Sequence, residues 1–224
     1  MVSSQALPSL LVFGPQNEFP SEEVLEDLRQ ELVGNPLLSA LTKAVDELPQ
    51  LWGVLISFDK DLSEIPGADY LVQLKCWVQE GGPFPHHQGR PPNLYALAVT
   101  FILQISQYAR YLRHLGDGSH RRLLESVRTA GIQGFCVGFI SAVVVASSQD
   151  ESEIGAAAAV GLRLAVCIGA YVDLETLRSR DASGASCVAI RFRESYAEEL
   201  TSVNTGLQSY PGVSPSGLIG LLFA

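Results

Sequence analysis

The chain has 224 residues, of which 47% are hydrophobic and 17% charged, so it can bury a large core and is not a disordered tail. Its net charge of −9 argues against nucleic acid as a partner, because phosphate backbones are bound by clustered Lys and Arg. The four cysteines are widely spaced and form no CxxC pair, which predicts no metal site, no disulfide framework and a reducing, cytoplasmic location; they are Cys76, Cys136, Cys167 and Cys187.

The N-terminal half predicts one strand followed by helices. Residues 10–14 (LLVFG) form a short apolar run closed by Gly-Pro, which is typical of a buried strand. Apolar residues at helical spacing then predict helices over 21–33, 37–48 and 69–79. The segment 81–93 (GGPFPHHQGRPPN) breaks this periodicity, so we expect a loop there.

The second half predicts an α/β arrangement. A long buried helix over 94–115 and a short one over 119–131 lead into an apolar run that ends at residue 148. An acidic connector separates this run from a second apolar stretch, 154–172. We expect both stretches to be buried in the core and not to form a membrane hairpin, because Arg163 in the middle of the second would be costly in a bilayer. Helix, strand, tight turn and helix in this order indicate the α/β class.

The chain changes character after residue 180. Residues 187–192 (CVAIRF) alternate like a strand, and residues 194–203 (ESYAEELTSV) have the pattern of an amphipathic helix. We therefore expect two units, a core over 1–180 and the start of a small α+β unit over 181–224.

A thiol between two glycines marks the candidate site. The stretch GFCVG, from Gly134 to Gly138, lies where a strand-like run becomes a helix-like run. A nucleophile elbow requires a strained residue at such a turn, with small residues two positions away on each side. The N-terminus of the following helix would favour a thiolate, and later an oxyanion, at Cys136. The alternative interpretation is that Cys136 is a small buried hydrophobic residue.

The GFCVG elbow, the early LLVFGPQ strand and turn, and the helix GLRLAVCIGAYVD after the elbow resemble a known family. They are similar to the starter-unit acyltransferase domains at the N-termini of fungal non-reducing polyketide synthases, relatives of the malonyl-CoA:acyl-carrier-protein transacylases with cysteine in place of serine. The resemblance covers residues 8–205. It implies an α/β-hydrolase-like acyltransferase core, a parallel sheet flanked by helices, followed by the beginning of a small ferredoxin-like α+β subdomain.

The resemblance also implies the chemistry. Cys136 would accept an acyl group from acyl-CoA or an acylated carrier protein and pass it to the phosphopantetheine thiol of an acyl carrier protein. The backbone N–H of Val137 and the turn at Gln16 would form the oxyanion hole, and no bound cofactor is expected. Acyl transfer needs both a nucleophile and stabilisation of a tetrahedral oxyanion, so these roles are chemically consistent.

A second comparison concerns the acyl group. The malonyl relatives hold a free carboxylate with an arginine that precedes a glycine, and here the corresponding pair is Ile168 and Gly169. This difference favours a neutral acyl chain, because an unpaired carboxylate in an apolar pocket is costly. Arg163, earlier in the same helix, is expected to make a structural ion pair.

The family's histidine base lies far after the nucleophile, and in this chain no histidine follows Cys136. The four histidines, His86, His87, His114 and His120, all precede it. The best candidate base is His120, because the helix that it opens leads into the elbow strand and should place it at the same edge of the sheet. The missing histidine also suggests a C-terminally truncated or remodelled member of the family.

Three functions remain open. The first is starter-unit acyl transfer through an acyl-Cys136 intermediate, and the second is a catalytically incomplete remnant or interaction module of the same fold. The third, a cysteine hydrolase acting on thioesters, is disfavoured because the FGPQ turn resembles that of the transacylases.

An acidic enzyme that binds acidic carrier proteins needs a local basic patch. Arg121 and Arg122, with Arg110, Arg113 and Arg128 nearby, are the predicted patch. The alternative is that these arginines form an ordinary solvated face.

Overall fold

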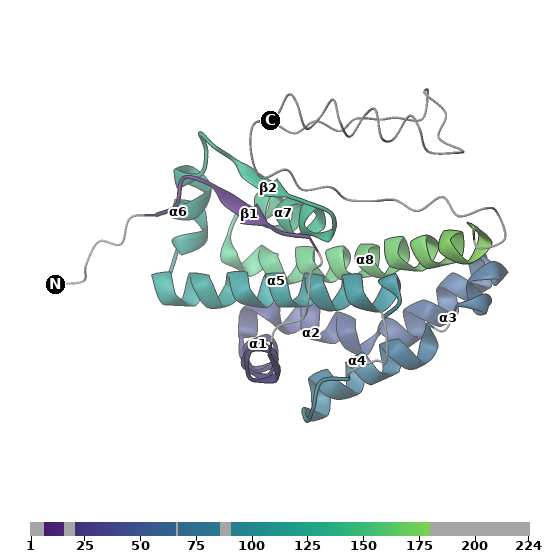
Figure 1. The fold of residues 1–224 in the computed structure, drawn as a ribbon. Helices are drawn as coiled ribbons and strands as arrows, with labels where there is room; N and C mark the ends of the chain where they lie inside the picture. Colours follow the sequence, from purple (N-terminus) through teal and green to yellow (C-terminus); the bar gives the residue numbers. More distant parts are fainter. Residues whose placement is uncertain (1–6, 16–20, 66, 86–90, 180–224) are drawn as a thin grey trace, which may run out of the picture. The chain divides into compact units, whose positions relative to one another are not determined.

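The structure, a computed structural model, describes residues 7–15, 21–65, 67–85 and 91–179, which are mostly helical (Figure 1). The chain divides into two compact units, 1–176 and 177–224. The described elements, with η for 3-10 helices, are β1 (Leu11–Phe13), α1 (Glu22–Gly34), η1 (Pro36–Leu38), α2 (Ser39–Asp46), α3 (Leu48–Phe58), η2 (Lys60–Glu64), α4 (Ala68–Glu80), α5 (Asn93–Leu115), α6 (Ser119–Ser126), β2 (Ile132–Gly134), α7 (Val137–Ser147) and α8 (Glu151–Ser179).

The β-structure is a small parallel sheet. β1 and β2 pair in parallel, with Leu11 opposite Ile132 and Phe13 opposite Gly134. The long crossover between them is what a parallel pair requires. Within the described residues this sheet has two strands, so the α/β class is present but the larger hydrolase-like sheet is not seen there. The expected ferredoxin-like unit, 181–224, lies outside the described residues.

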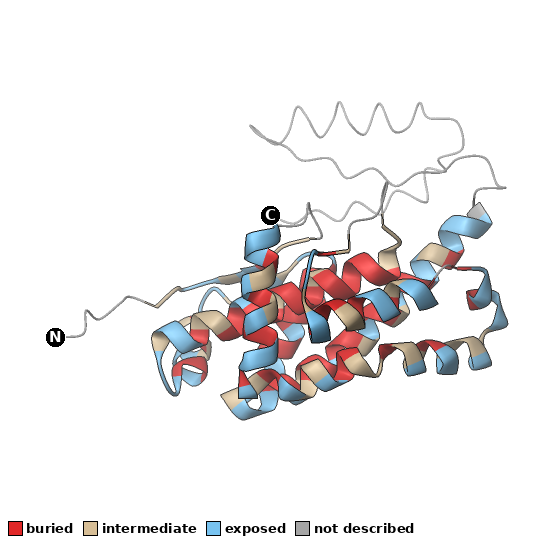
Figure 2. Ribbon diagram, turned by 90° about the horizontal axis from the view of Figure 1, so that it is seen from below, coloured by how far each residue is buried: buried red, intermediate tan, exposed pale blue. Residues whose placement is uncertain are grey.

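α5 is the central helix of the first unit. Fourteen of its 23 residues are buried, which is the pattern of a helix surrounded by neighbours. It contacts α1, α4, α6 and α7, and Figure 2 shows the buried positions gathered where the helices face one another. α7 contacts α5 as well as β1 and β2, so it joins the sheet to the helical body.

Most helices lie where the apolar spacing predicts them, but α6 ends at Ser126, short of the predicted 131, and the region after α1 differs. The predicted helix over 37–48 is shorter, and α3 follows it as a separate, unpredicted helix. Pro49 occupies the first turn of α3, where a missing N–H is tolerated because first-turn amides lack intrahelical acceptors. Leu48 and Trp52 of this helix are buried, and the partly buried Leu51 and Leu55 complete an apolar stripe at helical spacing.

α8 is long and apolar, and it packs against the rest of the first unit. A Cβ on Gly169 would overlap the backbone of Leu94, so α8 and the start of α5 are in direct contact. Arg163 makes the predicted structural ion pair, with Nη2 2.7 Å from Oε2 of Glu47. Among the described residues α8 is the one helix long and apolar enough to cross a membrane, and over half of its most apolar window is buried in the molecule.

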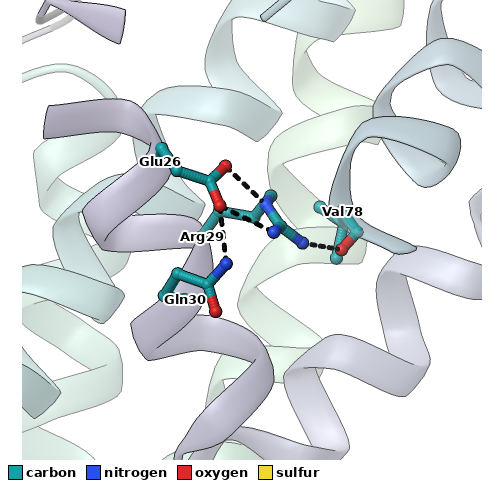
Figure 3. Close-up of polar contacts among 4 residues, drawn as sticks. All are labelled: Glu26, Arg29, Gln30 and Val78. Atoms are coloured by element: carbon teal, nitrogen blue, oxygen red, sulfur yellow. Dashed lines mark hydrogen bonds and ion pairs between the residues drawn. The ribbon is translucent and has the colours of Figure 1, made fainter. Parts of the chain in front are cut away.

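Arg29 connects α1 to the end of α4 (Figure 3). Its guanidinium donates to both carboxylate oxygens of Glu26, each at 2.7 Å, and its Nη1 donates to the carbonyl oxygen of Val78 at 3.0 Å. Gln30 Nε2 also donates to Glu26, at 2.6 Å. These hydrogen bonds, that of Arg29 foremost, lower the pKa of Glu26 to about 2. Glu26 is therefore ionised at neutral pH, where its carboxylate pairs with the guanidinium of Arg29.

Candidate active site

Cys136 lies at a sharp turn between β2 and α7. β2 ends at Gly134 and α7 begins at Val137, so two residues make the turn. The backbone of Cys136 has φ 58° and ψ −128°, a conformation disfavoured for any residue with a Cβ. It is the only non-glycine with a positive φ in the described part of the chain. The strand, strained turn and helix are the geometry that the Gly-x-Cys-x-Gly spacing predicts.

The two glycines of the elbow allow three segments of backbone to meet. A Cβ on Gly134 would overlap the backbone of Gly138 and Phe139. A Cβ on Gly138 would overlap the carbonyl oxygens of Phe13 and Gly14, at the end of β1. Any larger residue at either position would push α7 away from the strands.

Backbone hydrogen bonds hold the turn in place. The N–H of Phe135 donates to the carbonyl oxygen of Phe13, and the N–H of Gly138 donates to that of Phe135, both at 3.0 Å. The N–H of Phe139 donates to the carbonyl oxygen of Cys136, also at 3.0 Å. The strained residue is thus fixed from the neighbouring strand and from the first turn of α7.

The arrangement places the thiol beside one backbone donor, the N–H of Val137. Cys136 is exposed at the N-terminus of α7, and of the first-turn amides those of Gly138 and Phe139 already donate to carbonyl oxygens. The N–H of Val137 is the first of these amides, at the positive end of the helix dipole. An oxyanion that develops on an acyl group attached to Cys136 would form next to this N–H. Gln16, the other expected donor, lies outside the described residues.

Exposure distinguishes Cys136 from the other described cysteines. Cys76 in α4 and Cys167 in α8 are partly buried, and burial raises the pKa of the Cys167 thiol. Cys187 lies outside the described residues. Of the three described thiols, Cys136 is therefore the one open to an acyl donor.

Gln104 of α5 links the end of β1 to α7. Its Nε2 donates to the carbonyl oxygen of Gly14 at 2.8 Å, and its Oε1 accepts from the hydroxyl of Ser141 at 2.6 Å. A backbone carbonyl only accepts hydrogen bonds, which sets the orientation of the amide and makes Ser141 the donor. Neither residue belongs to a sequence motif. The one available signal is that each is polar between apolar neighbours, Gln104 between Leu103 and Ile105 and Ser141 between Ile140 and Ala142.

His120 does not reach the elbow, so its prediction as the base is wrong. Its Nε2–H donates to the carbonyl oxygen of Ser148 at 2.9 Å, and its Nδ1 accepts from the hydroxyl of Tyr108 at 2.6 Å. Ser148 follows the last residue of α7, whereas Cys136 precedes the first. At 1.5 Å per residue, the 11-residue helix separates the two sites by about 16 Å. The ring is fully buried and both nitrogens are occupied, so His120 is structural.

The other histidines supply no base within the described residues. His114 is exposed in the last turn of α5, next to α6. His86 and His87 lie outside the described residues. The described part of the chain therefore places no histidine beside Cys136.

Two arginines of the predicted docking patch are bound by acidic residues of α1. Arg110 Nη1 lies 3.4 Å from Oδ2 of Asp27, and Arg113 Nη2 lies 2.5 Å from Oε2 of Glu31. Glu31 is almost fully buried, whereas the Arg113 side chain is 63% exposed, so the second pair joins α1 and α5 at the surface. Both arginines remain at the surface, but each is paired with an acidic residue.

Arg121 and Arg122 are exposed on α6. Arg122 Nη2 donates to the carbonyl oxygen of Leu115 at 3.2 Å. Arg121 lines a surface hollow together with Asp150 and Glu151. This part of the surface carries charges of both signs.

Exposed apolar side chains lie next to Cys136 in the chain. Phe135 and Phe139, on either side of Cys136 in the chain, are 56% and 63% exposed. Ile168 is exposed on α8, in the position where the resemblance places the carboxylate-binding arginine of the malonyl relatives. The elbow therefore exposes two aromatic side chains close to Cys136 in the chain.

Comparison with known proteins identifies similar sequences. The family profile described as "Starter unit:ACP transacylase in aflatoxin biosynthesis" matches residues 11–215. A non-reducing polyketide synthase of Aspergillus fumigatus is 35% identical over 215 residues, which cover 94% of this chain. Methylphloroacetophenone synthase of Cladonia uncialis is 38% identical over 190 residues, 84% of this chain. 5-Methylorsellinic acid synthase of Aspergillus terreus is 35% identical over 205 residues, 92% of this chain. The chain spans only 12%, 7% and 8% of the lengths of these three proteins.

Proposed function

The chain belongs to the starter unit:ACP transacylase family, and we propose from this that it loads a starter acyl group in polyketide biosynthesis through a thioester on Cys136. The acyl donor is acyl-CoA or an acylated carrier protein, and the acceptor is the phosphopantetheine thiol of an acyl carrier protein. The observation that supports this most directly is the exposed thiol on a strained turn at the N-terminus of α7.

The transfer proceeds in two exchanges of one thioester for another. In the first, the thiolate of Cys136 attacks the acyl carbon of the donor, the carbonyl becomes a tetrahedral oxyanion, and the C–S bond to CoA breaks. The departing CoA thiolate takes a proton from solvent. In the second, the carrier's phosphopantetheine thiolate attacks the acyl-Cys136 carbon, and the cysteine leaves as a thiolate.

The oxyanion is stabilised by backbone donors. The N–H of Val137 and the helix dipole of α7 face the position where the negative charge develops. Gln16 remains the proposed source of the second donor. Loss of one donor of this kind typically costs about 10²- to 10³-fold in rate.

The first exchange can begin without a base held against Cys136. A fraction of any cysteine thiol is thiolate at neutral pH, and the thiolate is already a strong nucleophile. The leaving group is also a thiol, so its departure does not require a strong acid. A positioned base typically contributes about 10²- to 10⁴-fold. We therefore expect slow acylation of Cys136 even though no described histidine lies beside it.

The substrate is a neutral acyl chain. Phe135 and Phe139 flank the thiol with apolar surface, and Ile168 replaces the arginine of the malonyl relatives. Burying a carboxylate without a cation is costly, so dicarboxylic acyl groups are disfavoured.

The acyl carrier protein docks at Arg121 and Arg122, which are exposed on α6. Because Asp150 and Glu151 lie beside Arg121, this contact depends on the arrangement of charges and not on a large positive field. Charge reversal at both arginines should slow transfer to the carrier and leave acylation by acyl-CoA unchanged. An unchanged transfer rate would contradict this docking site.

Intact-protein mass spectrometry tests the function. After incubation with short and medium acyl-CoAs, the wild type should gain the mass of one acyl group, and Cys136→Ala should gain none. Cys76→Ala, at a partly buried thiol in α4, is the matched control and should behave like the wild type. Addition of a phosphopantetheinylated carrier protein should then remove the acyl group from Cys136.

The outcomes separate the alternatives. No adduct on a folded wild type with any of these donors would contradict the proposal and indicate a non-catalytic member of the family. Loss of the acyl group to water and not to the carrier would indicate a thioester hydrolase.

A further inference from the structure

One side chain, that of Gln104, joins three elements around the elbow. It projects from α5, donates to the carbonyl oxygen of Gly14 after β1, and accepts from Ser141 in the second turn of α7. The carbonyl oxygen of Gly14 is also one of the atoms that a Cβ on Gly138 would overlap. The Gly14 peptide is therefore held between the Gln104 amide and the backbone of α7.

The polar character of this junction is not needed for packing. Ser141 is fully buried, and Gln104 stands between the buried side chains of Leu103 and Ile105. A pair of buried polar groups can often be replaced by apolar groups of the same shape with little change in stability. An apolar replacement would lose the directional constraint of these hydrogen bonds. Bonds from both ends of one planar amide fix the end of β1 relative to α7.

We propose that Gln104 is a positioning residue for acyl transfer, which holds the end of β1 and the first turns of α7 in the geometry that the Cys136 oxyanion requires. This inference rests on the proposed function. Ser141 lies one helical turn after Val137, so the anchored part of α7 directly follows the amide that faces the oxyanion. Movement of this turn changes the direction of the Val137 N–H and leaves the thiol itself exposed.

Two reactions of the same thiol separate positioning from a general structural role. Acylation by an acyl-CoA passes through an oxyanion and depends on the aligned N–H donors. Alkylation by iodoacetamide is a direct displacement at carbon, forms no oxyanion and depends on access to the thiolate. A positioning residue should affect the first rate and not the second.

The experiment compares wild type, Gln104→Met, Ser141→Ala and Gln107→Met by intact-protein mass spectrometry. Methionine conserves the volume of glutamine and removes both hydrogen bonds, and Gln107 is an exposed residue on the same helix. Gln104→Met and Ser141→Ala should slow acylation by about tenfold or more, because aligned oxyanion donors contribute about 10²- to 10³-fold. Alkylation should stay within about twofold. Gln107→Met should match the wild type in both reactions.

A double variant adds a further check. If Gln104 and Ser141 act as one unit, combining Gln104→Met with Ser141→Ala should slow acylation little more than either change alone. Full multiplication of the two effects would contradict a shared junction.

The remaining outcomes would contradict either the inference or the proposed function. Wild-type acylation rates in both Gln104→Met and Ser141→Ala would overturn the inference and leave the proposed function in place. Equal slowing of acylation and alkylation would also overturn it, since access to the thiol and not oxyanion geometry would then have changed. A wild type that is alkylated but never acylated would overturn the proposed function, and the inference with it.

Discussion

Gly138 of α7 lies directly against the carbonyl oxygen of Phe13, the last residue of β1, with no room for a side chain between them. Phe13 also accepts a hydrogen bond from the N–H of Phe135, so one carbonyl touches both sides of the turn that carries Cys136. The position of Cys136 is therefore set by backbone contact between elements far apart in the sequence.

Gly138→Ala should disrupt this contact. The added methyl group overlaps two backbone oxygens that cannot rotate away, so we expect a loss of about 1–3 kcal/mol in the free energy of unfolding, as for other overpacked sites. Acylation of Cys136 should fall more than alkylation. Gly53→Ala is the matched control, since nothing lies within 4 Å of a Cβ there and the helix should gain about 0.5–1 kcal/mol. Urea unfolding of both variants measures the difference, and a Gly138→Ala protein as stable and active as wild type would contradict the close approach.

The sequence alone predicts the elbow well because its signals are local. The strand over 11–13, the strained turn at Cys136 and the following helix depend on residues adjacent in the chain, and apolar runs with glycines mark each boundary. The pairing of Arg163 could also be foreseen, since a charge in the middle of an apolar helix requires a partner.

Contacts between distant segments could not be predicted in the same way. Gln104 and Gly14 are joined across 90 residues, and no periodicity links them. His120 does open the helix before the elbow strand, but its ring turns to the far end of α7, where Tyr108 and Ser148 satisfy it. The order of the elements places His120 in the helix before the elbow strand, but it does not determine which way the ring points.

Cys136→Gly should be more stable than Cys136→Ala. At φ 58° and ψ −128° a residue with a Cβ carries strain of about 1–3 kcal/mol. Glycine removes that strain, and its extra backbone entropy costs about 0.5–1 kcal/mol. We therefore expect a net gain of about 1 kcal/mol over alanine in urea unfolding, although both variants lack the thiol and accept no acyl group. Equal or reversed stabilities would show that the turn is relaxed in solution.

Ile168→Arg should broaden the acyl groups accepted at Cys136. A charge-assisted hydrogen bond contributes about 1.5–3 kcal/mol, so an arginine that reaches the acyl group should raise the malonyl-to-butyryl ratio of adducts by about tenfold or more. Val160→Arg, an exposed position two turns earlier on the same helix, controls for added charge and should leave the ratio unchanged. Competition between the two acyl-CoAs, read by mass spectrometry, gives the ratio. An unchanged malonyl-to-butyryl ratio in Ile168→Arg would contradict a contact between this residue and the acyl group.

The Glu26 to Arg29 link should make stability depend on pH in acid. The pKa of Glu26 is about 2 in the folded protein, below the usual value of about 4.3 in an unfolded chain. Its contribution is therefore present above about pH 5 and is lost as the pH falls toward 2. Because the Glu26 side chain is 41% exposed, we expect Glu26→Gln to cost less than about 1 kcal/mol at pH 7. Urea unfolding at pH 7, 5 and 3 should show this difference narrowing between pH 5 and 3, whereas Glu64→Gln, at an exposed position in η2, should show no comparable narrowing.

His120→Ala should lower the stability of the protein without slowing acylation of Cys136. The change leaves the buried hydroxyl of Tyr108 and the carbonyl of Ser148 without a partner and opens a cavity, so the free energy of unfolding should fall by about 2–4 kcal/mol. The acylation rate of Cys136, measured at a temperature where the variant remains folded, should stay within about twofold of wild type because the ring lies at the other end of α7. His114→Ala, at an exposed residue, should change neither quantity. Loss of a general base typically lowers a rate by about 10²- to 10⁴-fold, so a drop of that size in folded His120→Ala would restore His120 as the base.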